Sequence, residues 1–149
     1  MERFQITVIA YCLMPNHYHF LFRQDGHYSM SAAMQDTFNT YTKAFNTYFS
    51  RSGTLFEGPF KAKYINNEVY LVHLCRYIHR NPLDAKLADS LESWQFSNYL
   101  EWIGKRKGKL VDHDFIKGRF PNPKDYIKLV LDYTPPEKLT ESIRQYIFD

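Results

Sequence analysis

The sequence predicts an α+β domain in which helices cover one face of an antiparallel sheet. Residues 4–13 and 17–23 are two apolar runs rich in β-branched and aromatic types, and Met14-Pro15-Asn16 between them has the chemistry of a turn. Farther along, apolar residues recur every three or four positions, which is the period of a helix. With 149 residues, 44% of them hydrophobic, the chain is long enough to bury one core. We therefore expect a single domain over residues 1–149 that contains an antiparallel hairpin.

A first helix is expected to begin near Ser29 and to end before Gly53. Its apolar positions follow spacings of three and four residues, which places them on one stripe that should pack on the core. They are Met30, Met34, Phe38, Tyr41, Phe45 and Tyr48. Residues 55–64 are a candidate strand that Gly58-Pro59 interrupts.

A second helix should begin near Asn67 and stop at Asn81, because Pro82 cannot continue it. Its apolar face is formed by Leu71, Leu74, Cys75 and Ile78. A neighbouring stripe, which is polar and aromatic, is formed by Tyr70, His73, Tyr77 and Asn81. A structural tyrosine at the rim of the core is the ordinary interpretation of Tyr77 in such a stripe.

Composition excludes several classes of protein. No run is long enough to span a membrane, and the N-terminus lacks the apolar core of a signal peptide. The only cysteines, Cys12 and Cys75, are far apart in apolar surroundings, which is typical of reduced core thiols in a cytoplasmic protein. The formal net charge of +3 is compatible with a polyanionic partner.

The second apolar run contains two histidines, His17 and His19. In a strand, residues two apart point to the same face, so both imidazoles project together. Tyr18, Phe20 and Phe22 project oppositely, and we expect that aromatic face to be core. Two imidazoles side by side are half of a metal site. A chance pair of surface histidines is the alternative.

Two short motifs carry a family resemblance. Pro-Asn-His-Tyr-His at 15–19 and Tyr-Ile-His-Arg-Asn-Pro-Leu-Asp-Ala at 77–85 resemble the REP-associated tyrosine transposases, which are single-tyrosine HUH transposases. Gly-Thr-Leu-Phe-Glu-Gly at 53–58 and Trp-Gln-Phe-Ser-Asn-Tyr at 94–99 are also similar to that family. Either of the first two motifs alone is a weak signal, but both together, in the family's order and with a helix between them, are a specific one. The resemblance extends from about residue 5 to about residue 120.

The resemblance implies an enzyme that cleaves and rejoins single-stranded DNA. In this family a tyrosine hydroxyl attacks a phosphodiester and leaves a 5′-phosphotyrosine and a free 3′-hydroxyl. Tyr77 matches the nucleophile, His17 and His19 match the metal ligands, and Asn81, one helical turn after Tyr77, matches a third ligand. The cofactor is then a divalent cation, Mg²⁺ or Mn²⁺. His79 is a less suitable ligand, because it points to the other side of the helix.

Zinc is an alternative metal, since it also accepts two histidines and Cys12 lies close in sequence. We consider a structural zinc site less favoured than a Mg²⁺ or Mn²⁺ site.

The implied substrate is an imperfect palindrome folded as a DNA hairpin with a single-stranded cleavage site nearby. Its phosphates should be contacted by basic residues near the histidine strand, near the tyrosine helix and in a basic loop. These are Arg23, Arg51, Lys61, Lys63, Arg76, Arg80, Lys105, Arg106 and Lys107. Unpaired bases could stack on Tyr64 or Tyr70. Such a protein would be nucleoid-associated within the cytoplasm.

The implied fold is ferredoxin-like or RRM-like, with a catalytic core over about residues 1–100 and a C-terminal extension over about 101–149. Two departures from the family stand out. Pro59 replaces a residue that is basic in many relatives, and Met1 begins inside the family pattern, after the first strand and helix of the template. We therefore expect one of three arrangements: a reading frame that starts upstream, a homodimer in which a partner's strand fills the gap, or direct pairing of residues 17–23 with 55–64.

Two other functions remain open on sequence alone. One is a non-catalytic hairpin-binding protein of the same ancestry. The other is a metal-dependent phosphoesterase that activates water and forms no covalent intermediate.

Overall fold

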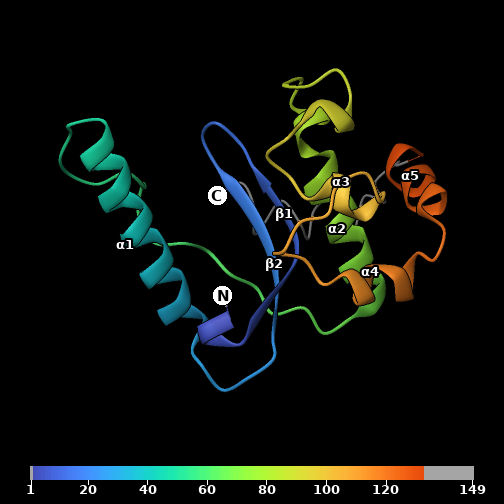
Figure 1. Cartoon of the computed structure of the whole chain (residues 1–149), viewed down its shortest axis with the longest axis horizontal. Coiled ribbons are helices and arrows are strands. Elements are labelled where there is room, and N and C mark those ends of the chain that lie inside the picture. The colour runs from blue at the N-terminus through green and yellow to red at the C-terminus, as the bar shows by residue number, and fades with distance from the viewer. Residues whose placement is uncertain (1, 133–149) are drawn as a thin grey trace.

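The computed structural model describes residues 2–132, and it confirms the α+β class (Figure 1). The strands are β1 (Ile6–Leu13) and β2 (Tyr18–Gln24). The helices are η1 (Glu2–Phe4), α1 (Met30–Tyr48), α2 (Glu68–Asp84), η2 (Leu91–Ser93), α3 (Tyr99–Trp102), α4 (His113–Arg119) and α5 (Pro123–Leu131). The last part of the expected C-terminal extension, residues 133–149, lies outside the described residues.

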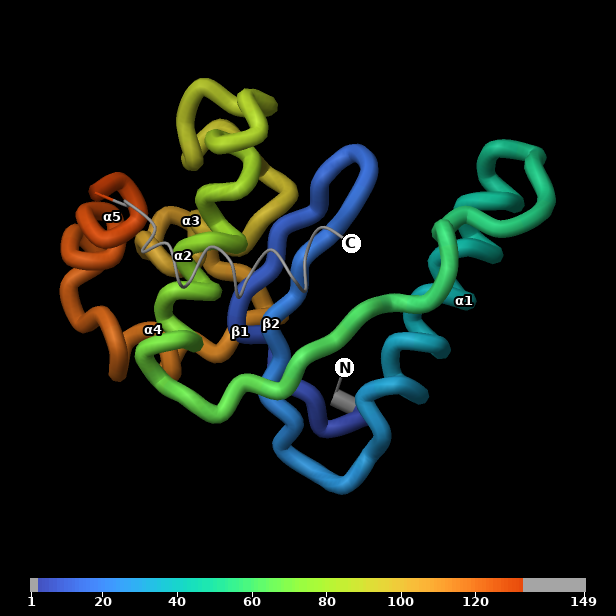
Figure 2. The backbone as a smooth tube through the Cα atoms, turned by 180° about the vertical axis from the view of Figure 1, so that it is seen from behind, coloured from blue at the N-terminus to red at the C-terminus, as the bar shows by residue number. Residues whose placement is uncertain are grey.

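The predicted hairpin is present. β1 and β2 pair antiparallel, with Cys12 opposite His19 and a register irregularity between Val8 and Ala10. The backbone N–H of Met14 donates to the carbonyl of His17 at 2.8 Å, which closes the turn. The hairpin separates α1 on one side from α2, α3, α4 and α5 on the other (Figures 1 and 2).

The core lies on the histidine face of the hairpin, so the prediction of an aromatic core face was wrong. Directly opposed residues of an antiparallel pair share a face, and therefore Cys12 and Ala10 project with His19 and Leu21. Cys12 and Ala10 are completely buried in one cluster with α2. Their small side chains leave room for a helix to pack closely on that face.

The aromatic face of β2 is only half-buried. Phe20 and Phe22 stack on each other with ring centroids 5.1 Å apart, and Tyr18 stacks on Phe38 of α1 at 4.8 Å. This face contacts α1 instead of the main core. The alternation of side chains along a strand assigns each residue to one of two faces. It does not show which face a helix covers when both faces contain apolar residues.

Helix α1 is less buried than its apolar stripe predicts. Ser29 caps it by accepting from the Ala32 N–H, and Ala33 and Met34 are its buried residues. At its far end, Tyr48 keeps 81% of its surface exposed. Figure 2 shows α1 as an arm beside the rest of the chain.

Residues 55–64 do not form the predicted strand, and within residues 2–132 the sheet has only two strands. Gly58 adopts a φ of +82°, and Pro59 has no N–H to donate to a ladder. The segment is held instead by Phe56, whose ring lies 4.7 Å from that of Phe38. The direct pairing of residues 17–23 with 55–64 is therefore not the arrangement of this structure.

Helix α2 passes through Pro82 and ends at Asp84, three residues beyond the predicted stop. Asn67 caps its start by accepting from the N–H groups of Val69 and Tyr70. A proline removes one backbone hydrogen bond from a helix, and the last turn is retained because the Ala85 N–H donates to the Asn81 carbonyl at 2.9 Å.

Residues 94–131 cover the outer edge of β1 and complete the core. Leu13 N–H donates to the Phe96 carbonyl at 2.8 Å, and Val8 forms a parallel bridge with Val111. Trp102 and Tyr126 pack on each other with ring centroids 4.4 Å apart, and both are almost fully buried. Among residues 2–132, no helix is both long and apolar enough to cross a bilayer.

Candidate active site

The two histidines lie at the turn end of β2, with ring centroids 5.0 Å apart. The Nδ1 atom of His17 lies 2.8 Å from Oδ1 of Asn16. Because an amide oxygen only accepts, Nδ1 is the donor in this contact, and Nε2 is the nitrogen left for another partner. That Nε2 atom is buried, and within residues 2–132 it has no hydrogen-bond partner. This is the state of an imidazole that is ready to ligate a cation.

The Nε2 atom of His19 is also buried and has no hydrogen-bond partner in the described part of the chain. Burial, together with repulsion from His17, lowers the pKa of His19 from 6.5 to about 4. His19 is therefore neutral near pH 7, as a metal ligand must be. Two adjacent orphaned nitrogens in a partly buried position fit a divalent cation.

Tyr77 belongs to the same cluster. Its ring centroid lies 5.6 Å from that of His19, edge-on at 68°, and its hydroxyl is buried. Asn81 lies four residues later on the same stripe of α2 and is 7% exposed. His19 thus comes from β2 and His17 from the residue just before it, while α2 carries Tyr77 and, one turn further on, Asn81.

Helix α2 is held against β1 by a buried polar network. His79 Nε2–H donates to Oδ1 of Asn98 at 2.8 Å, and its Nδ1 accepts from the Tyr126 hydroxyl at 2.6 Å. Asn98 also accepts from the Tyr11 N–H at 2.6 Å and donates to the Ile9 carbonyl at 2.9 Å. His79 is 1% exposed, and both of its nitrogens are engaged in this network, so it is not available as a ligand.

Sequence reasoning missed this network. Asn98 lies in the Trp-Gln-Phe-Ser-Asn-Tyr segment that carries part of the resemblance, but nothing in that segment indicates its partners. The network joins β1 to the turn of α2 between Tyr77 and Asn81, and it therefore positions both residues relative to the hairpin.

Cys12 lies opposite His19 in the hairpin, and burial raises the pKa of its thiol to about 12. Its Sγ lies 3.7 Å from Sδ of Met14. Within the described residues, no group of three His, Cys, Asp or Glu side chains is arranged to hold a metal. The two imidazole nitrogens that have no hydrogen-bond partner in residues 2–132 would suit a cation whose remaining ligands are oxygens.

Arg76 and Arg80 are turned toward α5. Arg76 is 7% exposed and donates to the Leu129 carbonyl at 3.4 Å and to Nδ1 of His73 at 2.7 Å. Arg80 pairs with Asp84 at 2.8 Å. The expected role of Arg76 in DNA contact does not fit its burial. One of its partners, the Leu129 carbonyl, lies on a helix some fifty residues later, which the local sequence does not reveal.

Several other basic residues are ion-paired near the surface. Arg23 lies between Asp25 and Asp112, at 2.5 and 2.9 Å. Lys105 pairs with Glu92, and Arg106 pairs with the buried Glu101. These cations are already engaged by carboxylates, so a phosphate would have to compete for them.

The remaining expected DNA contacts are exposed. Arg51, Lys61 and Lys107 form no ion pair with a carboxylate in the described part of the chain. Lys63 is exposed as well, and its Nζ lies 5.5 Å from the ring centroid of Tyr70. These four residues are the most accessible of the expected phosphate contacts.

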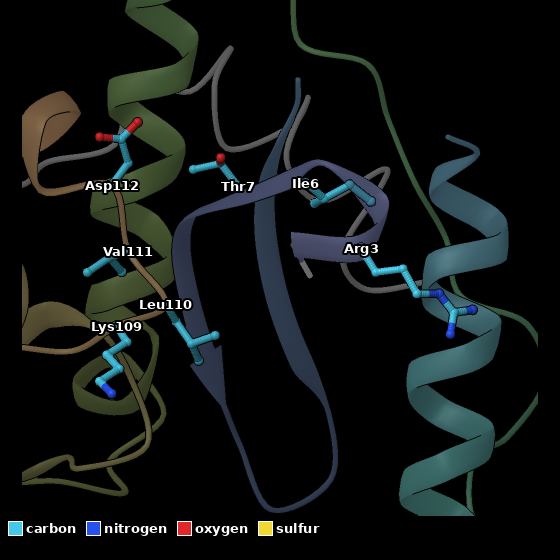
Figure 3. Close-up of a pocket in the computed structure, with 7 residues that line it drawn as sticks. All are labelled: Arg3, Ile6, Thr7, Lys109, Leu110, Val111 and Asp112. Atoms are coloured by element: carbon cyan, nitrogen blue, oxygen red, sulfur yellow. The ribbon is translucent and has the colours of Figure 1, made fainter. Parts of the chain in front are cut away.

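A cavity of about 490 Å³ lies beside the first residues of β1 (Figure 3). It is lined by the start of β1, by Arg3 and by residues 109–112. Ile6, in its wall, pairs with Gln24, whereas His19 pairs with Cys12 near the turn. This cavity is therefore separate from the His17–His19–Tyr77 cluster.

Comparison with known proteins gives one match. Residues 1–81 match the family model described as IS200-like transposase, and this segment covers more than half of the chain and includes His17, His19, Tyr77 and Asn81. No curated protein and no solved structure shows a significant match.

Proposed function

The chain belongs to the IS200-like transposases, and from this we propose that it is a REP-associated tyrosine transposase that cleaves and rejoins single-stranded DNA beside hairpins. The observation that carries the proposal is the contact of Tyr77 with His19, beside two imidazoles whose buried Nε2 atoms have no hydrogen-bond partner in residues 2–132. A nucleophile adjacent to a pair of available nitrogen ligands is the arrangement that metal-assisted phosphoryl transfer requires.

The proposed reaction begins with attack by the Tyr77 oxygen on the phosphorus of a phosphodiester. A bond forms between that oxygen and phosphorus, and the bond from phosphorus to the 3′-oxygen breaks. The phenolic proton passes to solvent, and the departing 3′-oxygen takes up a proton. The products are a 5′-phosphotyrosine and a free 3′-hydroxyl. Attack by another 3′-hydroxyl on the phosphotyrosine reverses these bond changes, joins the strands and restores Tyr77.

His17, His19 and Asn81 are the residues that we propose as ligands of Mg²⁺ or Mn²⁺. IS200-like transposases are generally metal-dependent. A bound divalent cation would polarise the scissile phosphate and offset its negative charge. The neutral state of His19 keeps its nitrogen available for this role near pH 7, because burial lowers its pKa to about 4. The packing of α2 on the hairpin holds the tyrosine near the two imidazoles.

DNA is the expected partner of a transposase, and the exposed cations support a backbone-contacting surface. Arg51, Lys61, Lys63 and Lys107 are exposed, and we propose them as the first phosphate contacts. Four other expected cations already pair with carboxylates, so each would have to exchange its carboxylate for a phosphate. They are Arg23, Arg80, Lys105 and Arg106. Association with the nucleoid would follow from this charge distribution.

We also propose that a second copy of the chain covers the outer edge of β2. Within the described residues β2 pairs only with β1, and an unpaired edge favours strand addition. The half-buried aromatic face next to this edge gives such a dimer apolar surface to bury. The molecular mass in solution tests this. A monodisperse monomer at micromolar concentration would contradict it.

The test of the catalytic proposal is a covalent adduct. Labelled DNA from the hairpin-forming repeats that flank the gene, incubated with the protein and Mn²⁺, should give a labelled protein band on a denaturing gel. A phosphoesterase would release cut DNA without such a band, and a non-catalytic hairpin-binding protein would bind the DNA without cutting it. Either of these results would overturn the proposal.

A further inference from the structure

The N-terminal end of α2 holds a second cavity, of about 350 Å³. Its walls include Lys63, Tyr64 and Asn66, from the segment that leads into α2, and Asn67 and Tyr70 at the helix start. The volume is in the range of pockets that bind small ligands. The reaction at Tyr77 does not by itself require this cavity.

The cavity lies on the same side of α2 as the nucleophile. Tyr70 precedes Tyr77 by seven residues, which is two helical turns and about 10 Å along the axis. Residues seven apart return to nearly the same direction around a helix, so the two tyrosines belong to one stripe. A DNA strand whose phosphate lies at Tyr77 can therefore run along this stripe to the cavity.

The chemistry of the walls suits a nucleobase. Tyr64 keeps 86% of its surface exposed, which leaves its ring open to stacking. The amide of Asn66 can both donate and accept hydrogen bonds at a base edge. The Nζ of Lys63 lies 5.5 Å from the Tyr70 ring centroid, so a cation stands at the rim where a phosphate would lie.

The remaining polar groups nearby are already used. Oδ1 of Asn67 accepts from the Val69 and Tyr70 N–H groups as the helix cap. The carboxylate of Glu68, the first residue of α2, pairs with Arg119 at 2.9 Å. Among the described residues, no carboxylate lines the cavity itself, so its walls do not repel a polyanionic strand.

We propose that this cavity binds one unpaired base of the single-stranded DNA next to the phosphate that Tyr77 attacks. The base stacks on Tyr64, and its phosphate lies near Lys63. This inference rests on the proposed function, because it takes single-stranded DNA as the substrate. It adds a site at which the enzyme binds an unpaired base itself, in addition to the contacts with the sugar-phosphate backbone.

The test measures the affinity of the full chain for fluorescein-labelled oligo(dT) by anisotropy. Tyr64→Ala should weaken binding about tenfold, which is the effect of losing one stacked base, while Tyr64→Phe should bind like the wild type. The matched control is Tyr48→Ala, which removes another highly exposed tyrosine, on α1, and should leave the affinity unchanged. Because Tyr64 is so exposed, its substitution should not affect folding.

An abasic oligonucleotide of the same length separates stacking from phosphate contact. Wild type and Tyr64→Ala should bind it equally, because no base is present to stack. Equal affinity of the two proteins for oligo(dT), or an equal loss on both oligonucleotides, would overturn the inference. The adduct assay keeps the two proposals distinct. A wild-type adduct without a Tyr64 effect on oligo(dT) removes only the cavity proposal, whereas a Tyr64 effect without any adduct removes only the transposase mechanism.

Discussion

The rings of Tyr77 and His19 meet in a T-shaped arrangement, with their centroids 5.6 Å apart, although the two residues belong to different elements that are joined by more than forty residues of chain. β2 carries the histidine and α2 carries the tyrosine. Their proximity depends on the packing of α2 against Cys12 and Ala10 and on the hydrogen bonds of Asn98 with His79 and β1. The site is therefore sensitive to the core as well as to its own side chains.

Tyr77→Phe should abolish the covalent DNA adduct and leave hairpin binding unchanged. The substitution removes only the hydroxyl, so the ring contact with His19 remains. Adduct formation is measured on a denaturing gel and binding by anisotropy. Tyr70→Phe is the matched control on the same helix stripe and should still form the adduct. An adduct with the Tyr77→Phe variant would mean that another tyrosine is the nucleophile.

His17→Ala combined with His19→Ala should abolish cleavage in Mg²⁺ or Mn²⁺. A second readout does not depend on activity: Mn²⁺ should raise the Tm of the wild type, because it binds the native state, and should not raise that of the double variant. His27→Ala, at an exposed position in the loop before α1, is the control and should keep both effects. Full wild-type cleavage in excess chelator would contradict the metal-site hypothesis.

The local parts of this site could be predicted from sequence. The spacing of His17 and His19 in an apolar run implies a shared strand face, and the spacing of Tyr77 and Asn81 implies a shared helix stripe. Both follow from the geometry of one element. The register of the hairpin, with Cys12 opposite His19, confirms the antiparallel pairing that the Pro15-Asn16 turn predicts.

The non-local parts could not be predicted. Both faces of β2 contain apolar residues, so the pattern could not show that α2 covers Leu21 and His19 and leaves Phe20 half-exposed. The burial of Arg76 depends on a carbonyl of Leu129, and that of His79 depends on Asn98 and Tyr126. Such partners meet only when the chain is folded, and a single sequence does not indicate them.

Lys61→Gln should reduce the salt dependence of DNA binding. Each phosphate contact releases condensed counterions, so the slope of log affinity against log salt should become shallower by about one for one lost contact. Lys117→Gln, which removes an exposed cation on α4, is the matched control and should leave the slope unchanged. If both variants keep the wild-type slope, Lys61 does not contact phosphate.

Tyr126→Phe should lower the free energy of unfolding by about 1–3 kcal/mol. The variant loses the hydroxyl that donates to Nδ1 of His79, and a buried acceptor without a donor carries a desolvation penalty of this size. Urea unfolding at pH 7 measures the change. Tyr41→Phe removes the hydroxyl of a half-exposed tyrosine on α1 and should change stability by less than about 0.5 kcal/mol. Similar small losses in the two variants would show that the Tyr126–His79 hydrogen bond contributes little.

The protein should lose stability as the pH falls from about 6.5 toward 4. Burial lowers the pKa of His79 to about 4, whereas the unfolded chain titrates near 6.5. In that interval the unfolded state binds a proton that the native state does not. The free energy of unfolding therefore rises with pH, and the contribution of His79 to it is complete above pH 6.5. At pH 5 the loss from this one group is on the order of 2 kcal/mol.

The measurement is urea unfolding at pH 7 and pH 5 in chelator, which keeps metal binding out of the comparison. His19 adds a loss of the same sign, because its pKa is also lowered to about 4. His79→Gln removes the titrating group, so its stability should change less between the two pH values than that of the wild type. If the wild type is equally stable at pH 7 and pH 5, these two imidazoles are not held neutral by the fold.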